Sequence, residues 1–362
     1  MPPRRTGVAN LPLHHGKAPR WLFERMVKLA REITIAIISE YGPDEMLHRL
    51  SHPHWFQAFG CVLGFDWHSS GVTTTLCGAL KEGLKGQEKD LGLFVAGGKG
   101  AVSRRTPSEI EGWGERVSVN PVPLVYASRM AAKVDNSAVQ DGYQLYHHTF
   151  LFTPGGSWAV VQQGMNAGNR YARRYHWLGE SVADFVNEPH SGIAAQAKSS
   201  TLNLVAGESG PARSTISGIA REEKPEAILA DLRRLKTLTL PAHHPVGLKD
   251  IHPDSLGRIL LGVYERQPED FERLLGLQGV GPKTLRALSL ISELVHGVAP
   301  SYRDPARYSF AHGGKDGHPY PVDRQTYDTS IELLAKAVQH SRLGLGEKRE
   351  ALGRLERMGG IR

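Results

Sequence analysis

The chain has 362 residues, of which 40% are hydrophobic, so it can bury two or three ordinary cores and is not a disordered protein. Its net charge of +7 and isoelectric point near 9.3 fit a polyanionic partner such as nucleic acid. Only Cys61 and Cys77 are present, which excludes a disulfide framework and a four-cysteine iron–sulfur cluster. We expect no cofactor. No apolar run approaches the roughly 20 residues that span a bilayer, so we expect a cytoplasmic protein.

Helical periodicity dominates residues 1–90, which we interpret as a helical N-terminal segment. Apolar residues recur at spacings of three and four from Leu22 to Ile37, and this predicts a helix that ends before Pro43. Further helices are predicted over residues 44–50 and 73–84. The polar and aromatic residues 65–71 between them fit either a pocket lining or a capped helix start.

A glycine-rich loop, residues 97–105, follows a short apolar strand and precedes a helix. The start of that helix is marked by a capping box of Thr106, Pro107 and Glu109. The loop lacks the Gly-Lys-Ser/Thr ending of a nucleotide-binding P-loop, so nucleotide hydrolysis is set aside. Its cations fit a contact with the DNA backbone or a solvated basic loop equally well. These cations are Lys99, Arg104 and Arg105.

A β-hairpin is the main feature of the middle domain, which we place at residues 91–215. Residues 143–152 and 158–164 are rich in β-branched and aromatic side chains, and a Pro-Gly-Gly turn separates them. Alternation puts His147 and His148 on opposite faces, so they cannot serve one site. Asp141 with either histidine, or His14 with His15, could hold a metal. No known ligand spacing is matched, so structural histidines are favoured and no metal site is predicted.

Basic and aromatic residues alternate over residues 166–177, directly after the hairpin. This mixture suits a groove that neutralises a sugar-phosphate backbone and stacks bases on aromatic rings, or an amphipathic surface with ordinary cation–π contacts. The arginines predicted to contact DNA are Arg170, Arg173 and Arg174. Residues 194–218, rich in small residues, are the best candidate for a linker.

The C-terminal part, residues 216–362, is predicted to be a helical domain built around a helix-hairpin-helix. Two apolar helices are joined through Gly279, Val280 and Gly281, and the second begins at Pro282. The free N–H groups of such a hairpin and of the first helical turn, which includes Thr284, make a site for a backbone phosphate. The predicted architecture is therefore α+β, with a helical start, a β-rich middle and a helical end.

The segment Leu-Gln-Gly-Val-Gly-Pro-Lys, ending at Lys283, together with the Pro-Val-Asp that ends at Asp323, resembles the helix-hairpin-helix DNA glycosylase superfamily. The resemblance covers the last third of the chain. It departs from the family pattern at Gln278, where a proline is usual, and in the separation of the lysine and aspartate, which is longer than in most members. The whole chain also resembles an uncharacterised prokaryotic family known only as a domain of unknown function.

The resemblance implies a DNA repair enzyme of the base-excision type, a bifunctional DNA glycosylase and AP lyase. In such an enzyme Lys283 attacks the sugar to form a Schiff base, and Asp323 stabilises the positive charge that develops on the sugar. The implied partner is duplex DNA with a damaged or abasic nucleotide. Two alternatives stay open. The first is a metal-dependent DNA nuclease with its active site in the middle domain, and the second is a non-catalytic DNA-binding protein.

Overall fold

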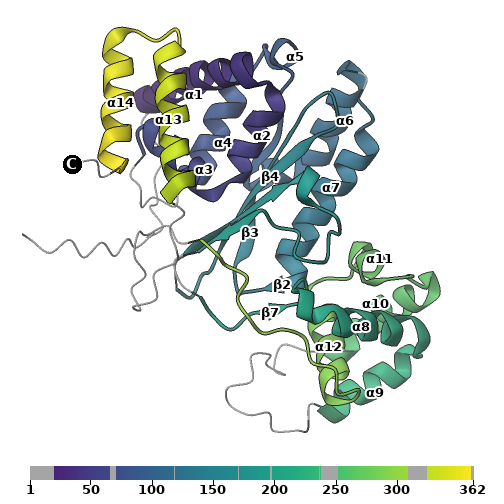
Figure 1. The fold of residues 1–362 in the computed structure, drawn as a ribbon. Helices are drawn as coiled ribbons and strands as arrows, with labels where there is room; N and C mark the ends of the chain where they lie inside the picture. The colour runs from purple at the N-terminus through teal and green to yellow at the C-terminus, as the bar shows by residue number, and fades with distance from the viewer. Residues whose placement is uncertain are drawn as a thin grey trace, which may run out of the picture.

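The computed structural model has an α+β fold in which a five-stranded antiparallel sheet lies between two layers of helices (Figure 1). The structure describes residues 20–65, 71–117, 119–169, 171–195, 198–235, 237, 252–308 and 324–359. Among these residues, no helix is both long enough and apolar enough to cross a membrane.

The helices before the sheet form one layer. They are α1 (Arg20–Tyr41), α2 (Pro43–Ser51), α3 (Pro53–Val62), α4 (Gly71–Leu84) and the short α5 (Glu88–Leu91). Apolar spacing predicted α1, α2 and α4, but it did not predict α3. Pro53 begins α3, and the ring of His52 caps it by accepting a hydrogen bond from the N–H of Trp55.

The sheet has the strand order β1-β3-β4-β5-β6, and every neighbouring pair is antiparallel. Its strands are β1 (Phe94–Lys99), β3 (Gln144–Phe152), β4 (Trp158–Met165), β5 (Ala172–Leu178) and β6 (Gly192–Ala194). The predicted hairpin is β3 with β4, in which Phe152 pairs with Trp158. A separate two-stranded ladder joins β2 (Val139–Gln140) to β7 (Leu202–Asn203).

Each face of the sheet belongs to a different hydrophobic core, because successive side chains of a strand point to opposite faces. One face contributes Phe94, Phe150 and Trp177 to the first core. This core continues through α6 (Thr106–Val117) and α7 (Pro121–Lys133) into the C-terminal helices. The other face contributes Leu151 and Val161 to the second core, beneath the N-terminal helices.

The first core also holds the helical group around the predicted hairpin. Its helices are α8 (Gly210–Glu222), α9 (Pro225–Leu235), α10 (Pro253–Arg266), α11 (Phe271–Gly276) and α12 (Pro282–Leu294). In Figure 1 this group lies at one end of the sheet, opposite α1. Helices α13 (Arg324–His340) and α14 (Leu345–Gly359) lie elsewhere, because their apolar residues join the second core with α1 and α3.

Three sequence-based interpretations therefore differ from the structure. Residues 216–362 do not pack as one helical unit, since α8 to α12 and α13 to α14 share different cores. The candidate linker 194–218 contains β7 and the start of α8, because Leu202 and Asn203 pair with β2 and a helix begins at Gly210. The capping box at Thr106 is also not formed. Glu109 instead accepts hydrogen bonds from the N–H of Gly97 and from Lys81.

Candidate nucleic-acid interface

The hairpin of residues 277–281 joins α11 to α12 as the sequence predicts, but its two glycines have different roles. Gly279 has φ +90°, a conformation that side chains with a Cβ seldom adopt. Gly281 is extended, with φ −146° and ψ −170°, and a Cβ there would meet no atom closer than 4.0 Å. A glycine is therefore needed for the turn only at Gly279, while Gly281 keeps the space in front of the hairpin open.

The hairpin is held in place by α7. Lys133 Nζ donates hydrogen bonds to the carbonyl oxygens of Val280, at 2.6 Å, and Leu277, at 3.2 Å. Burial lowers the pKa of Lys133. Gln140 adds a second tie, because its Nε2 donates to the carbonyl oxygen of Pro282 at 2.9 Å. These contacts occupy carbonyl groups, which leaves the N–H side of the hairpin for a ligand.

The first turn of α12 provides the groups that face solvent. Pro282 is the first helical residue, so the N–H groups of Lys283 and Thr284 have no acceptor within the helix. The side chain of Lys283 is exposed. The side chains of Val280 and Thr284 are buried, with 1% and 2% of their surface exposed, so these two residues can offer a ligand only their backbone. Arg129, one turn before Lys133 on α7, is also exposed.

The basic loop of the middle domain is exposed as expected. Lys99 ends β1, and Arg104 and Arg105 lie in the 3-10 turn η1 (Gly100–Arg105) that leads into α6. Lys99 Nζ lies 5.9 Å from the ring centre of Tyr146. The positions of these cations leave both predicted roles open, the DNA contact and the solvated loop.

Arg173 and Arg174 differ from the prediction, because both lie inside the protein on β5. Arg173 donates to Asp141 at 2.9 Å and to Asp304 at 2.7 Å, and all three side chains are buried. Burial disfavours the charge of Arg173, but the two carboxylates outweigh it and raise the pKa of Arg173. Basic and aromatic residues alternate here because they form a buried polar strand. Neither arginine is available to a phosphate on the surface, and Arg170 lies outside the described residues.

Arg174 belongs to a second buried group of polar side chains, on the opposite face of β5. Its guanidinium contacts Gln57, and its Nε donates to His176 at 2.7 Å. Burial lowers the pKa of Arg174 to about 9. His176 Nδ1 lies 2.9 Å from the carbonyl oxygen of Leu50, so the imidazole bridges α2 and the sheet.

The second predicted catalytic residue, Asp323, lies outside the described residues. The helix that follows it, α13, packs in the second core, whereas Lys283 lies in the first turn of α12, a helix of the first core. Lys283 is also exposed and not enclosed in an apolar pocket. In this arrangement Lys283 is well placed for a phosphate contact. Its amine is open to water, and only a bound DNA could exclude that water.

The sequence did not reveal a buried acid that orients a histidine beside a cavity. Asp135 Oδ1 lies 2.5 Å from Nε2 of His190, and Asp135 Oδ2 accepts from Trp177 at 3.0 Å and from Gln162 at 2.5 Å. Asp135 lies in a single π-helical turn, η2 (Val134–Ala138), and is fully buried. Nothing in the spacing of residues 135 and 190 indicates that they meet, because the sheet brings them together.

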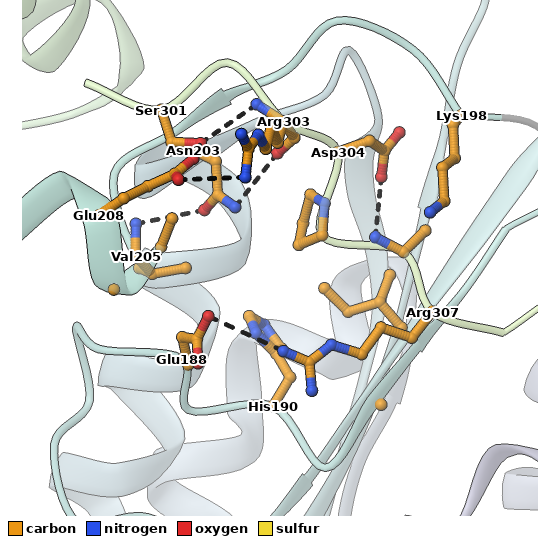
Figure 2. A pocket seen from close by; sticks show the side chains of 16 residues that line it. Glu188, His190, Lys198, Asn203, Val205, Glu208, Ser301, Arg303, Asp304 and Arg307 are labelled. Carbon is orange, nitrogen blue, oxygen red and sulfur yellow. Dashed lines mark hydrogen bonds and ion pairs between the residues drawn. The ribbon is translucent and has the colours of Figure 1, made fainter. Parts of the chain in front are cut away.

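His190 lines a cavity of about 310 Å³ between β6, the 207–209 turn and the segment 301–308 (Figure 2). Two exposed ion pairs lie at this cavity. Arg303 NH1 is 3.3 Å from Glu208, and Arg307 NH2 is 3.8 Å from Glu188. Within the described part of the chain, no group of three or more His, Cys, Asp or Glu side chains is arranged to hold a metal ion.

His147 and His148 face opposite sides of the sheet, as alternation predicts. His148 bonds Ser128 and Gln162, and His147 bonds Thr149 at 2.9 Å. Burial lowers the pKa of both imidazoles, for His147 to about 3. Asp141, the carboxylate considered with them for a metal, bonds Arg173 and Tyr175. His14 and His15 lie outside the described residues.

Comparison with known proteins found no match among curated proteins and none among solved structures. A family model does match, over residues 7–322, which is most of the chain and includes both the sheet and the hairpin. The chain therefore belongs to the family described as "Protein of unknown function (DUF763)".

Proposed function

We propose that this protein binds duplex DNA through the sugar-phosphate backbone, with the hairpin and the first turn of α12 as the main contact. The observation that carries the proposal is the fixed hairpin. Lys133 and Gln140 occupy its carbonyl groups, while unpaired N–H groups and the exposed amine of Lys283 lie together on the solvent side. A backbone phosphate fits such an array of donors.

The contact should read the DNA backbone and not the base sequence. N–H groups and a lysine amine recognise phosphate oxygens, which are the same at every base pair. The hairpin offers few side chains that could enter a groove, because Val280 and Thr284 are buried. The net charge of +7 adds a general attraction to a polyanion. We therefore expect affinity that varies with salt concentration and little with sequence.

Base excision with AP lyase chemistry is the more specific form of the proposal. It is supported by the exposure of the Lys283 amine beside the hairpin, where a bound phosphate would bring the sugar of the same nucleotide close. The amine would attack C1′ of an abasic sugar and form a Schiff base with loss of water. In this form Asp323 stabilises the positive charge on the sugar as a damaged base departs.

Fluorescence anisotropy with a short labelled duplex tests the DNA-binding proposal. Between about 50 and about 200 mM salt, two phosphate contacts alone weaken affinity by about tenfold, and more contacts weaken it further. Lys283→Gln should reduce the salt slope by about one contact. Lys89→Gln is the matched control, because Lys89 is an exposed lysine on α5, away from the hairpin in Figure 1. Affinity that does not change with salt would exclude the nucleic acid as partner.

A further inference from the structure

A second cavity, of about 840 Å³, lies between α4, β1 and α6. Because β1 is an edge strand of the sheet, its backbone forms the floor of this cavity, and the two helices form the walls. The glycine-rich loop of residues 97–105 begins on the floor. Among the residues that the structure describes, none of α11 or α12 lines the cavity. It is therefore separate from the proposed DNA contact.

Two charged side chains meet at the cavity floor and are fixed on one glycine. Lys81 Nζ donates to the carbonyl oxygen of Gly97 at 2.8 Å, and Glu109 Oε2 accepts from the N–H of Gly97 at 2.8 Å. The amine and the same carboxylate oxygen lie 2.6 Å apart. A Cβ at Gly97 would lie 2.3 Å from the carbonyl oxygen of His148, so only glycine fits here. The ion pair is thus held at one place.

The same ion pair has hydrogen-bonding groups to spare. An ammonium group has three N–H donors, and Lys81 uses two of them, while only one oxygen of Glu109 is bonded. Among the described residues, no group bonds Glu109 Oε1 or accepts the third N–H of Lys81. Both side chains line the cavity and are 35% and 26% exposed, so a ligand can reach them. The cavity therefore offers a donor beside an acceptor.

The charges of the cavity lining do not select an ion. The lining holds both signs of charge, with the cations Lys81, Lys85, Lys99 and Arg116 and the carboxylates Glu82, Glu88 and Glu109. Lys81 pairs with Glu109, and Lys85 lies 3.7 Å from Glu82. At the floor, an anion would meet Glu109 and a cation would meet Lys81. A neutral ligand with its own acceptor next to a donor matches the ion pair without separating it.

The walls of the cavity suit a flat ring. Trp113 of α6 lines the cavity, and its ring is supported by Phe94, with the ring centres 4.9 Å apart. Gly78 of α4 and Gly112 of α6 also line the cavity, and neither brings a side chain into the space. A Cβ at Gly112 would meet no atom within 4 Å. An aromatic ligand can therefore lie against Trp113 and approach the backbone of both helices.

We propose that this cavity binds a purine base through the Lys81–Glu109 pair and Trp113. A purine base is neutral and planar, and one of its edges carries an acceptor next to an N–H donor, O6 beside N1–H in guanine and N7 beside the N6 amine in adenine. The acceptor takes the third N–H of Lys81, and the donor bonds Oε1 of Glu109. The two fused rings match the indole surface of Trp113.

Isothermal titration calorimetry of the full chain with guanosine and with adenosine tests the site. These nucleosides carry no phosphate, so the result does not depend on the hairpin contact. At least one of them should bind. Its analogue without the N–H donor, 1-methylguanosine or N6,N6-dimethyladenosine, should bind about tenfold more weakly or worse. No binding of either nucleoside, or equal affinity for the methylated analogue, would overturn the proposal.

Two variants change the site in different ways. Glu109→Gln keeps an oxygen for the N–H of Gly97 but places an amide N–H group where the ligand's donor binds, so it should fold and bind the nucleoside about tenfold more weakly or worse. Gly112→Leu should fill the cavity and abolish binding. Circular dichroism checks the fold of both variants. Wild-type affinity in either folded variant would contradict the proposal.

Each variant has a matched control. Glu111→Gln changes an exposed carboxylate of the same helix that does not line the cavity, and it should bind the nucleoside as wild type does. Gly218→Leu on α8 is the control for Gly112→Leu, because a Cβ at Gly218 would also meet no atom within 4 Å. A loss of affinity in the controls equal to that in the site variants would assign the effect to the fold and refute the site.

Single-stranded oligonucleotides identify the source of the base. An oligothymidylate with one central purine is compared with the same strand without the purine. If the base belongs to a nucleic-acid strand, wild type should prefer the strand with the purine, and Glu109→Gln should lose that preference. If the two strands bind equally while the nucleoside binds, the site takes a free nucleoside or nucleotide. Both outcomes support the purine site, and failure of the nucleoside titration refutes it.

Discussion

Lys133 Nζ lies 2.6 Å from the carbonyl oxygen of Val280, and this contact joins α7 to a hairpin that is 147 positions away in the chain. The amine donates to two carbonyl groups, and α7 also contacts α11, the helix before the hairpin. The conformation of the proposed DNA contact therefore depends on a residue of the middle of the chain. The hairpin and the sheet are one packed unit through this lysine and the shared first core.

Lys133→Met should weaken DNA binding because it removes both hydrogen bonds and keeps the apolar stem. We expect about a tenfold loss of affinity and a loss of about 1–2 kcal/mol in the free energy of unfolding, the usual range for two hydrogen bonds. Anisotropy and urea denaturation measure the two effects. Arg129→Met changes an exposed cation one turn earlier and should leave stability unchanged. Wild-type affinity and stability in Lys133→Met would show that the hairpin holds its shape without α7.

The two hairpin glycines should respond differently to alanine. Gly279→Ala forces a Cβ into φ +90°, and its nearest neighbour would be Ile259 Cγ1 at 3.4 Å, so we expect a loss of about 1 kcal/mol or more in stability. Gly281→Ala is unstrained and should fold with wild-type stability. Its Cβ would nevertheless obstruct a phosphate, so binding to every duplex should fall. If Gly281→Ala binds DNA normally, the hairpin is not the contact surface.

Borohydride trapping on an abasic duplex in EDTA tests the lyase form of the proposal. If Lys283 forms the Schiff base, wild type should give a covalent protein–DNA adduct without a metal, and Lys283→Gln should give none while it keeps most binding. Asp323→Asn should slow release of a damaged base and still allow trapping at a pre-formed abasic site. Equal trapping by wild type and Lys283→Gln would exclude this lysine as the nucleophile. A hydrolytic nuclease would give no adduct at all.

Asp304→Asn should destabilise the protein strongly, because it removes one of two carboxylates from the buried Arg173. Breaking one partner of a buried ion pair typically costs about 3–5 kcal/mol, and the remaining Asp141 should limit the loss to the lower end. Urea denaturation gives the value. Glu208→Gln removes a carboxylate from the exposed Arg303 and should cost less than about 1 kcal/mol. Similar losses in both variants would show that Arg173 does not link the sheet to residues 301–308.

Acidification should reduce stability through the buried imidazoles. Burial lowers the pKa of His147 to about 3, while in the unfolded chain an imidazole titrates near about 6.5. Between these values only the unfolded state binds the proton, so the free energy of unfolding falls as pH falls. From pH 7 to about 5.5 this single group contributes about 1 kcal/mol. His147→Gln should lose less stability than wild type over that window. If the free energy of unfolding depends on pH identically in the two proteins, groups other than His147 cause the loss of stability.

Local patterns in the sequence predicted the elements but not how they combine. The spacing of Leu22 to Ile37 predicted α1, and the alternation of residues 143–164 predicted the β3–β4 hairpin, because each pattern reflects burial of one face. The Gly-Val-Gly turn was equally local, and its α11–α12 hairpin is confirmed. The sequence did not predict helix α3. This helix is buried on nearly all sides, so its residues show no periodic contrast between a polar and an apolar face.

Features that depend on distant contacts could not be read from spacing. Arg173 and Arg174 have the composition of a nucleic-acid groove, and only the position of β5 inside the sheet shows that they are enclosed. Asp135 and His190 meet only in the folded chain, where Trp177 of β5 contacts both of them. A buried carboxylate with three donors has no signature along the chain. The tertiary fold alone makes it visible.

The second core joins segments that are far apart in the sequence, because α13 and α14 pack on α1 and α3 across the whole sheet and hairpin region. Helix α1 also packs on α2 and α4, and these contacts are local in the chain. Contacts between distant segments carry the larger loop-closure entropy, so we expect the local contacts of α1 to form before those with α13 and α14. The N-terminal layer then folds in two stages, and its outer stage depends on the sheet that brings α13 and α14 back to α1.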